Sequence, residues 1–130
     1  MLLPPGDEAF LNDKGVPFEV SQEGVTTCVL LPGWSLPAGY TESSSDLLLR
    51  LSAGYPDVPP DMWWFSPDLI RTDGQTIPAT DLHEEHLGRT WQRWSRHFNG
   101  GQWLPGHDTL ESFLALVSTD VRIHAAGVAV

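Results

Sequence analysis

The proline-rich segment Tyr55-Pro56-Asp57-Val58-Pro59-Pro60 constrains the fold of this chain more than any other feature. Proline has no backbone N–H and a fixed φ, so this segment forms neither a helix nor the interior of a sheet. Before it, Leu47, Leu49 and Leu51 recur at every second position, and the apolar residues 62–65 follow it. We therefore predict an ordered connection between two strands.

Short apolar segments define most of the predicted architecture. β-Branched, aromatic and aliphatic residues concentrate in segments that glycine and proline separate, which is typical of strands. We predict four strands joined as an antiparallel meander: residues 18–20, 25–31, 46–52 and 62–65. From residue 66 to residue 101 the periodicity fades, which predicts a long ordered loop with one turn of helix near residues 82–87.

Two helices complete the predicted fold. Residues 6–15 begin with acidic side chains and end with Lys14 and Gly15, the order that favours a short helix. A longer amphipathic helix is predicted from Asp108, because Glu111 three residues later gives a capping-box pattern and apolar residues follow at helical spacing. Helix, meander, loop and helix together predict one α+β domain over residues 1–130.

The charge balance and the single cysteine limit the possible functions. Acidic residues number 17 against 7 Lys and Arg, and the formal net charge of −10 disfavours binding to nucleic acid. No apolar run approaches the roughly 20 residues that cross a bilayer. The N-terminus lacks the basic start of a signal peptide, so we expect a cytoplasmic protein with no membrane segment. Cys28, alone in an apolar strand, is expected to be a buried and unreactive thiol.

Three motifs, in their order along the chain, resemble one known family. The segment 55–60 is similar to the Tyr-Pro-x-x-Pro-Pro segment that E2 ubiquitin-conjugating enzymes carry between their third and fourth strands. Gln102-Trp103-Leu104-Pro105 resembles the Trp-x-Pro that precedes their central helix. Thr90-Trp91-Gln92-Arg93-Trp94-Ser95-Arg96-His97, with Pro59-Pro60-Asp61-Met62 before it, resembles the bacterial prokaryotic E2 family E. The resemblance covers essentially the whole chain. It implies a UBC-like fold without the two C-terminal helices of typical E2 enzymes.

The resemblance places a serine where the family has its nucleophile. In typical E2 enzymes the catalytic cysteine lies eight residues before the tryptophan of the Trp-x-Pro motif. That tryptophan is Trp103 here, so the corresponding position is Ser95. A serine hydroxyl is a poor nucleophile at neutral pH and needs a neighbouring base. His97 is the nearest histidine in sequence, and His83 and His86 are alternatives from the same predicted loop.

The family's oxyanion donor is also replaced. Typical E2 enzymes use the asparagine of a His-Pro-Asn motif, and the corresponding place here is Glu85-His86-Leu87. Arginine side chains are the donors that we expect in its stead. The predicted catalytic set is therefore Ser95, His97, Arg96, Arg93 and His86.

The resemblance also implies partners, namely an E1-like adenylyltransferase and a ubiquitin-like modifier protein. It implies no cofactor and no metal on this chain, because the E1 consumes the ATP. The leading hypothesis is an E2-like carrier in a bacterial ubiquitin-like conjugation pathway, which holds the modifier as an oxyester on Ser95. A non-catalytic E2-like scaffold in the same pathway is the main alternative.

A metal-dependent hydrolase using His83, His86 and His97 is a further reading. The zinc-protease motif needs two histidines four residues apart, whereas His83 and His86 are three apart. The sequence therefore favours a solvated polar segment over a metal site here.

Overall fold

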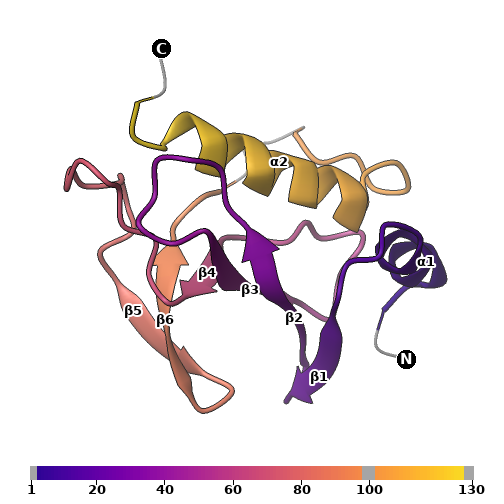
Figure 1. Ribbon diagram of the computed structural model, residues 1–130. Helices are drawn as coiled ribbons and strands as arrows, with labels where there is room; N and C mark the ends of the chain where they lie inside the picture. The colour runs from indigo at the N-terminus through magenta and orange to yellow at the C-terminus, as the bar shows by residue number, and fades with distance from the viewer. Residues whose placement is uncertain (1–2, 98–101, 128–130) are drawn as a thin grey trace.

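Six antiparallel strands form one curled sheet, and a long helix covers one of its faces (Figure 1). The computed structural model describes residues 3–97 and 102–127. Its elements in chain order are α1 (Pro5–Asp13), β1 (Glu19–Glu23), β2 (Thr26–Ser35), β3 (Ser44–Leu51), β4 (Trp63–Ser66), β5 (His83–His86), β6 (Arg89–Trp94) and α2 (Leu110–Ile123). The predicted α+β class with two helices is confirmed.

The predicted four-stranded meander is wrong in its number of strands. Strands β1 to β4 do follow one another in meander order, but β6 and β5 extend the sheet beyond β4. Strand β6 pairs with β4, where Trp94 lies opposite Trp63, and β5 forms the sheet edge. The predicted loop over residues 66–101 thus contains a β-hairpin, and the helical turn predicted at 82–87 is strand β5. Residues 98–101 of that loop lie outside the described residues.

Two features explain why the sequence patterns did not predict this hairpin. Its turn is Leu87-Gly88, with φ of 54° and 73°, and such turns are usually marked by Asn-Gly or Asp-Gly. In β6, Gln92 is buried between Trp91 and Trp94, so polar and apolar residues do not alternate. The Gln92 carboxamide accepts the Leu69 N–H at 2.9 Å and donates to the Leu69 carbonyl at 3.1 Å. A buried amide needs such partners, and here they come from a distant segment of the chain.

The alternation predicted for β3 is confirmed, and it gives the sheet two apolar faces. Leu47, Leu49 and Leu51 belong to the main core, which also contains the buried residues of α2. The apolar α2 positions predicted from helical spacing are all buried: Leu110, Phe113, Leu114, Val117 and Val121. A smaller cluster lies apart from this core: Cys28, Leu48, Trp64 and Trp91. Because successive strand residues point to opposite faces, Leu48 reaches that second cluster.

The motifs that carry the family resemblance contact one another. The Trp103 indole donates to the Pro56 carbonyl at 2.8 Å, and the Tyr55 and Trp103 rings lie 6.3 Å apart. The Tyr55 hydroxyl donates to the buried Asp7 carboxylate at 2.6 Å, which also accepts the Leu110 N–H at 3.1 Å. Asp7 therefore joins α1, the proline-rich segment and the N-terminus of α2.

The N-terminus of α2 differs from the predicted capping box. Thr109, not Asp108, precedes the first helical residue, and its N–H donates to the Ser112 hydroxyl at 2.9 Å. The Asp108 carboxylate instead accepts the Leu104 N–H at 2.7 Å, so it closes the preceding turn. In the described part of the chain, no helix is long and apolar enough to cross a bilayer.

Candidate functional site

Ser95 follows the last residue of β6 and is partly buried. Its N–H donates to the Ala79 carbonyl at 3.0 Å, which fixes the backbone. Its hydroxyl oxygen accepts the Arg93 Nε–H at 3.0 Å. No hydrogen bond joins this hydroxyl to a histidine within residues 3–97 and 102–127. The structure thus brings Ser95 and Arg93 together, but among the described residues it pairs the predicted nucleophile with no histidine.

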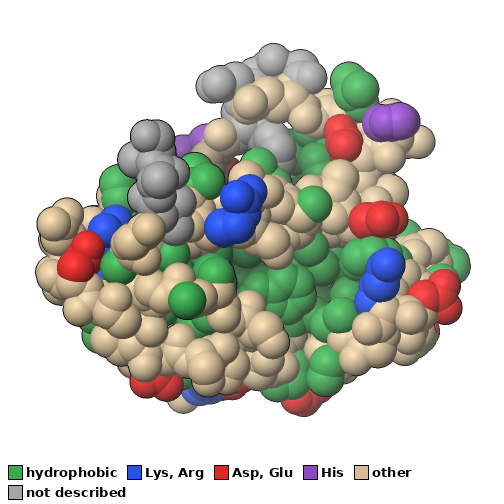
Figure 2. All heavy atoms as spheres, turned by 45° about the horizontal axis from the view of Figure 1, so that its top comes forward, with side chains coloured by type: hydrophobic (Ala, Val, Ile, Leu, Met, Phe, Trp, Pro, Cys, Tyr) green, Lys and Arg blue, Asp and Glu red, His purple; other side chains and the backbone are tan. Residues whose placement is uncertain are grey.

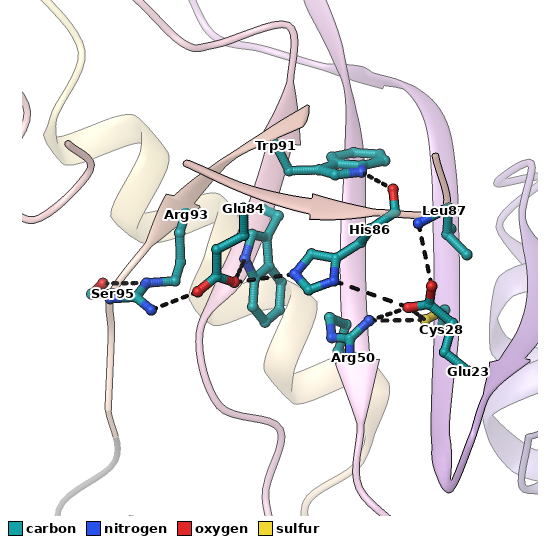
Figure 3. A network of polar contacts seen from close by, with 10 residues as sticks. Glu23, Cys28, Arg50, Glu84, His86, Leu87, Trp91, Arg93 and Ser95 are labelled. Carbon is teal, nitrogen blue, oxygen red and sulfur yellow. Dashed lines mark hydrogen bonds and ion pairs between the residues drawn. The ribbon is translucent and has the colours of Figure 1, made fainter. Parts of the chain in front are cut away.

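Arg93 belongs to a chain of polar contacts across one face of the sheet (Figure 3). Its Nη1 donates to Glu84 Oε2 at 2.7 Å, and the other Glu84 oxygen accepts the Trp64 indole N–H at 2.9 Å. His86 Nε2 lies 3.1 Å from that same oxygen. Burial alone would raise the pKa of Glu84, but the hydrogen bonds from His86, Trp64 and Arg93 outweigh it and hold the pKa below that of an ordinary glutamate. Glu84 therefore stays ionised and holds Arg93 beside Ser95.

His86, predicted as a possible base, lies within this network. Besides Glu84, its ring packs edge-on against Trp64, with 5.4 Å between the ring centroids. Its Nδ1 is 4.0 Å from a Glu23 oxygen. The network thus separates His86 from Ser95, because Glu84 and Arg93 lie between them (Figure 3).

His97 pairs with Asp61, an acidic residue to which the sequence motifs gave no catalytic role. His97 Nδ1 lies 2.9 Å from Asp61 Oδ1, and both side chains are more than half exposed. A carboxylate on Nδ1 orients an imidazole and leaves Nε2 available for a proton, which is the arrangement of a catalytic base. Asp61 directly follows Pro59 and Pro60. An acidic residue beside the proline-rich motif was the only available signal, because 36 residues separate the pair in sequence.

Arg96 is held by several partners. Its Nε donates to Asp120 at 2.7 Å and its Nη1 donates to the Pro78 carbonyl at 2.9 Å, while its guanidinium lies 4.9 Å from the Trp94 ring centroid. Its Nη2 and the Trp63 indole nitrogen are buried, and neither has a hydrogen-bond acceptor among residues 3–97 and 102–127. Arg96, His97 and Trp63 line the same cavity of about 180 Å³. A buried donor without an acceptor costs about 1–3 kcal/mol, so a movement that brought Arg96 Nη2 to an acceptor in this cavity would recover part of that free energy.

Cys28, the single cysteine of the sequence, is poorly suited to act as a nucleophile. Cys28 is fully buried in β2, and its Sγ lies 3.5 Å from both Glu23 Oε1 and Arg50 Nη1. Burial, and then the hydrogen bond to Glu23, raise the pKa of Cys28 to about 11. Arg50 forms an ion pair with Glu23 and lowers the pKa of that carboxyl. A thiolate is therefore scarce at neutral pH, which agrees with the predicted unreactive core cysteine.

His83, the other histidine considered as a base, also pairs with an acidic side chain. His83 Nε2 lies 2.6 Å from Asp68, whereas His86 lies against Glu84. Over residues 3–97 and 102–127, no three His, Cys, Asp or Glu side chains group where they could hold a metal ion.

Comparison with protein families assigns the chain to one of them. The family model described as prokaryotic E2 family E matches residues 3–123. The chain belongs to this family. The resemblance inferred from the motifs is thereby confirmed, and membership of prokaryotic E2 family E supports an E2-like role in a conjugation pathway. Comparison with curated proteins and with solved structures gave no match.

Proposed function

We propose that this member of prokaryotic E2 family E is the E2-like carrier of a bacterial ubiquitin-like conjugation pathway. Ser95 accepts the C-terminal acyl group of the modifier from an E1-like adenylyltransferase and holds it as an oxyester. The observation that carries the proposal is the contact between Asp61 and His97 at 2.9 Å. His97 lies two residues after Ser95, the position at which the family has its nucleophile. It supplies an oriented base of the kind that a serine nucleophile needs.

The proposed transfer is an acyl exchange. Ser95 Oγ attacks the carbonyl carbon of the thioester between the modifier and the E1, and its proton passes to His97 Nε2. The acyl–oxygen bond forms as the acyl–sulfur bond breaks, and the proton then returns to the departing thiolate. Ser95 and His97 must approach each other when the modifier binds, because catalytic hydrogen bonds often tighten only in the complex.

The two arginines have different parts in this proposal. Arg93 already donates to Ser95 Oγ and so stabilises negative charge on that oxygen during attack and departure. Arg96 lines the same cavity as His97, and its buried Nη2 has no acceptor in the described part of the chain. It is the donor that we assign to the oxyanion of the tetrahedral intermediate. His86 is a structural member of the Glu84 network, so we give it no proton-transfer role.

A non-catalytic scaffold is the second candidate, and one observation favours it. The Ser95 hydroxyl accepts a hydrogen bond from Arg93 and meets no imidazole among the described residues. On that reading the chain binds the modifier or the E1 without a covalent step.

The deciding experiment is intact mass spectrometry of the chain after incubation with its E1, its modifier and ATP. We expect an adduct on the wild type that resists thiols, yields to hydroxylamine or alkali, and disappears in Ser95→Ala. Ser21→Ala, which removes an exposed hydroxyl from β1, is the matched control and keeps the adduct. Ser95→Cys is expected to give an adduct that thiols release.

The same assay tests the base. We expect His97→Gln to slow adduct formation by about 100-fold or more, the usual contribution of general base catalysis. An adduct that survives Ser95→Ala excludes Ser95 as the carrier. If the E1 is charged with modifier and no adduct forms on wild type, the scaffold function replaces the carrier function.

A further inference from the structure

Three adjoining hollows lie between α2, the end of α1 and the end of β2. Trp34 and Ser118 line all three, and the volumes are about 310, 260 and 280 Å³. Each hollow can receive a side chain, since a water molecule occupies about 30 Å³ in the liquid. Their shared lining makes them one groove, which we call the Trp34 groove.

The Trp34 groove has a mainly apolar lining. Its apolar residues come from α1 and the segment after it, from β2 and the segment after it, and from α2: Phe10, Val16, Pro17, Pro32, Trp34, Pro37, Leu114, Ala115 and Val121. In Figure 2, hydrophobic side chains line a hollow on the face turned to the viewer, and Lys or Arg side chains lie on two sides of it. A hollow with an apolar lining can receive the apolar side chains of another molecule.

The Lys and Arg side chains at this groove differ from the others in their lack of an acidic partner among the described residues. The chain has seven Lys and Arg. Five of them form ion pairs with acidic side chains: Arg50, Arg71, Arg89, Arg93 and Arg96. Lys14 and Arg122 form no ion pair within residues 3–97 and 102–127, and both line the Trp34 groove. In a chain with 17 acidic residues, the two cations that pair with no carboxylate of the described residues flank one apolar groove.

We propose that the Trp34 groove docks a short apolar segment of a partner protein that carries a carboxylate on each side. Along α2 the lining runs from Glu111 to Arg122, twelve residues, and the eleven steps between them correspond to about 16 Å of helix. An extended segment covers that length with about five residues. Its apolar side chains enter the hollows beside Trp34 and Ser118, and its carboxylates meet Lys14 at one end and Arg122 at the other.

The charges determine the chemistry of the partner. Two cations on a chain of net charge −10 do not provide the phosphate contacts that a nucleic acid needs. Glu111 is the one acidic side chain of the lining and lies in the hollow that Lys14 lines. It disfavours a second carboxylate close to it, so the acidic residue at this end belongs on the Lys14 side. The proposal does not depend on catalysis at Ser95, because no residue of the Ser95 site lines this groove.

Two sets of capped six-residue peptides test the proposal. The four inner positions take every combination of Leu, Phe, Pro and Ala, and both end residues are Asp in one set and Lys in the other. Arrayed peptides identify binders, and fluorescence anisotropy measures the affinity of the tightest Asp-ended peptide. The indole N–H signal of Trp34 in nuclear magnetic resonance spectra reports where it binds. We expect Asp-ended peptides with inner Leu or Phe to bind and to shift that signal.

Two variants locate the contacts. The double variant Lys14→Glu/Arg122→Glu is expected to weaken the Asp-ended peptide by about tenfold, from two exposed ion pairs, and to bind its Lys-ended counterpart. Ser118→Trp fills the groove from the exposed side of α2 and is expected to abolish binding, whereas Ser21→Trp on β1 preserves it. Circular dichroism verifies that each variant is folded.

Several results would overturn the proposal. One is that no Asp-ended peptide binds more tightly than the peptide with four inner alanines. Another is an affinity that charge reversal leaves unchanged, or binding that does not move the Trp34 signal. A wild-type dimer that Ser118→Trp dissociates would assign the groove to a second copy of this chain instead.

Discussion

Asp7 is the residue whose replacement we expect to destabilise the fold most informatively. Its carboxylate is 4% exposed and accepts two hydrogen bonds, from Tyr55 at 2.6 Å and from the Leu110 N–H at 3.1 Å. It thereby ties α1 to the proline-rich segment and to the N-terminus of α2, where negative charge is favourable. Burial and the hydrogen bond to Asp7 raise the pKa of Tyr55 above its ordinary value, so the phenol remains a donor.

The magnitude follows from these two bonds. A hydrogen bond to a charged group contributes about 1.5–3 kcal/mol. Asp7→Ala loses both bonds and leaves the Tyr55 hydroxyl without its acceptor, but it also removes a buried charge that was costly to desolvate. We therefore expect a loss of about 3 kcal/mol in the free energy of unfolding, or about 12 °C in Tm. Tyr55→Phe removes one bond, and about 2 kcal/mol is expected.

Urea unfolding of wild type, both single variants and the double variant measures the coupling between Asp7 and Tyr55. A coupling energy of about 1.5–2 kcal/mol is expected, because the double variant loses their shared bond only once. Asp13→Ala is the matched control: Asp13 is exposed at the other end of α1, and the change is expected to stay within about 0.5 kcal/mol. A coupling below about 0.5 kcal/mol, or an Asp7→Ala variant as stable as Asp13→Ala, would refute this account of how the motifs are joined.

Two further predictions concern stability. Gly39 has φ of +112°, and a Cβ there would lie 2.6 Å from the Ala126 carbonyl oxygen, whereas Gly74 has φ of +74° and open space around it. We expect Gly39→Ala to lower the free energy of unfolding, measured by thermal unfolding, by about 3 kcal/mol and Gly74→Ala to lower it by about 1 kcal/mol. Equal losses would contradict the close approach of residue 39 to the Ala126 backbone. Burial, and then Asp120, raise the pKa of Tyr40 from 10.0 to about 12, so its contribution to stability is complete below pH 10 and is lost as the pH rises towards 12. In an absorbance titration neither tyrosine of the folded chain is expected to ionise near pH 10, and tyrosinate at that pH with unchanged circular dichroism would disprove it.

Motif spacing predicted Ser95 as the nucleophile and nearby Arg93 as a donor, and of this candidate site the structure shows the contact between the two residues. The contact between Arg93 and Ser95 spans two residues, and their side chains share one face at the end of β6. Asp61 lies 36 residues from His97, and the role of Glu84 depends on the pairing of β5 with β6. No local pattern encodes such pairings, so the contacts of His97 and Arg93 with these two carboxylates were not predictable.

The sequence by itself determined the elements whose cause is local. Alternating leucines made β3, helical spacing placed the buried side of α2, and prolines enforced the connection after β3, because side-chain period and backbone sterics act within a few residues. The tertiary structure decided the β5–β6 hairpin, where the backbone of Leu69 satisfies the amide of Gln92 in the core. It also decided that Lys14 and Arg122 line the groove beside Trp34 and form no ion pair within residues 3–97 and 102–127. The physical reason is the same in both cases: hydrogen bonds and ion pairs are satisfied by whichever groups the fold brings within about 3 Å, and distance along the chain does not fix that.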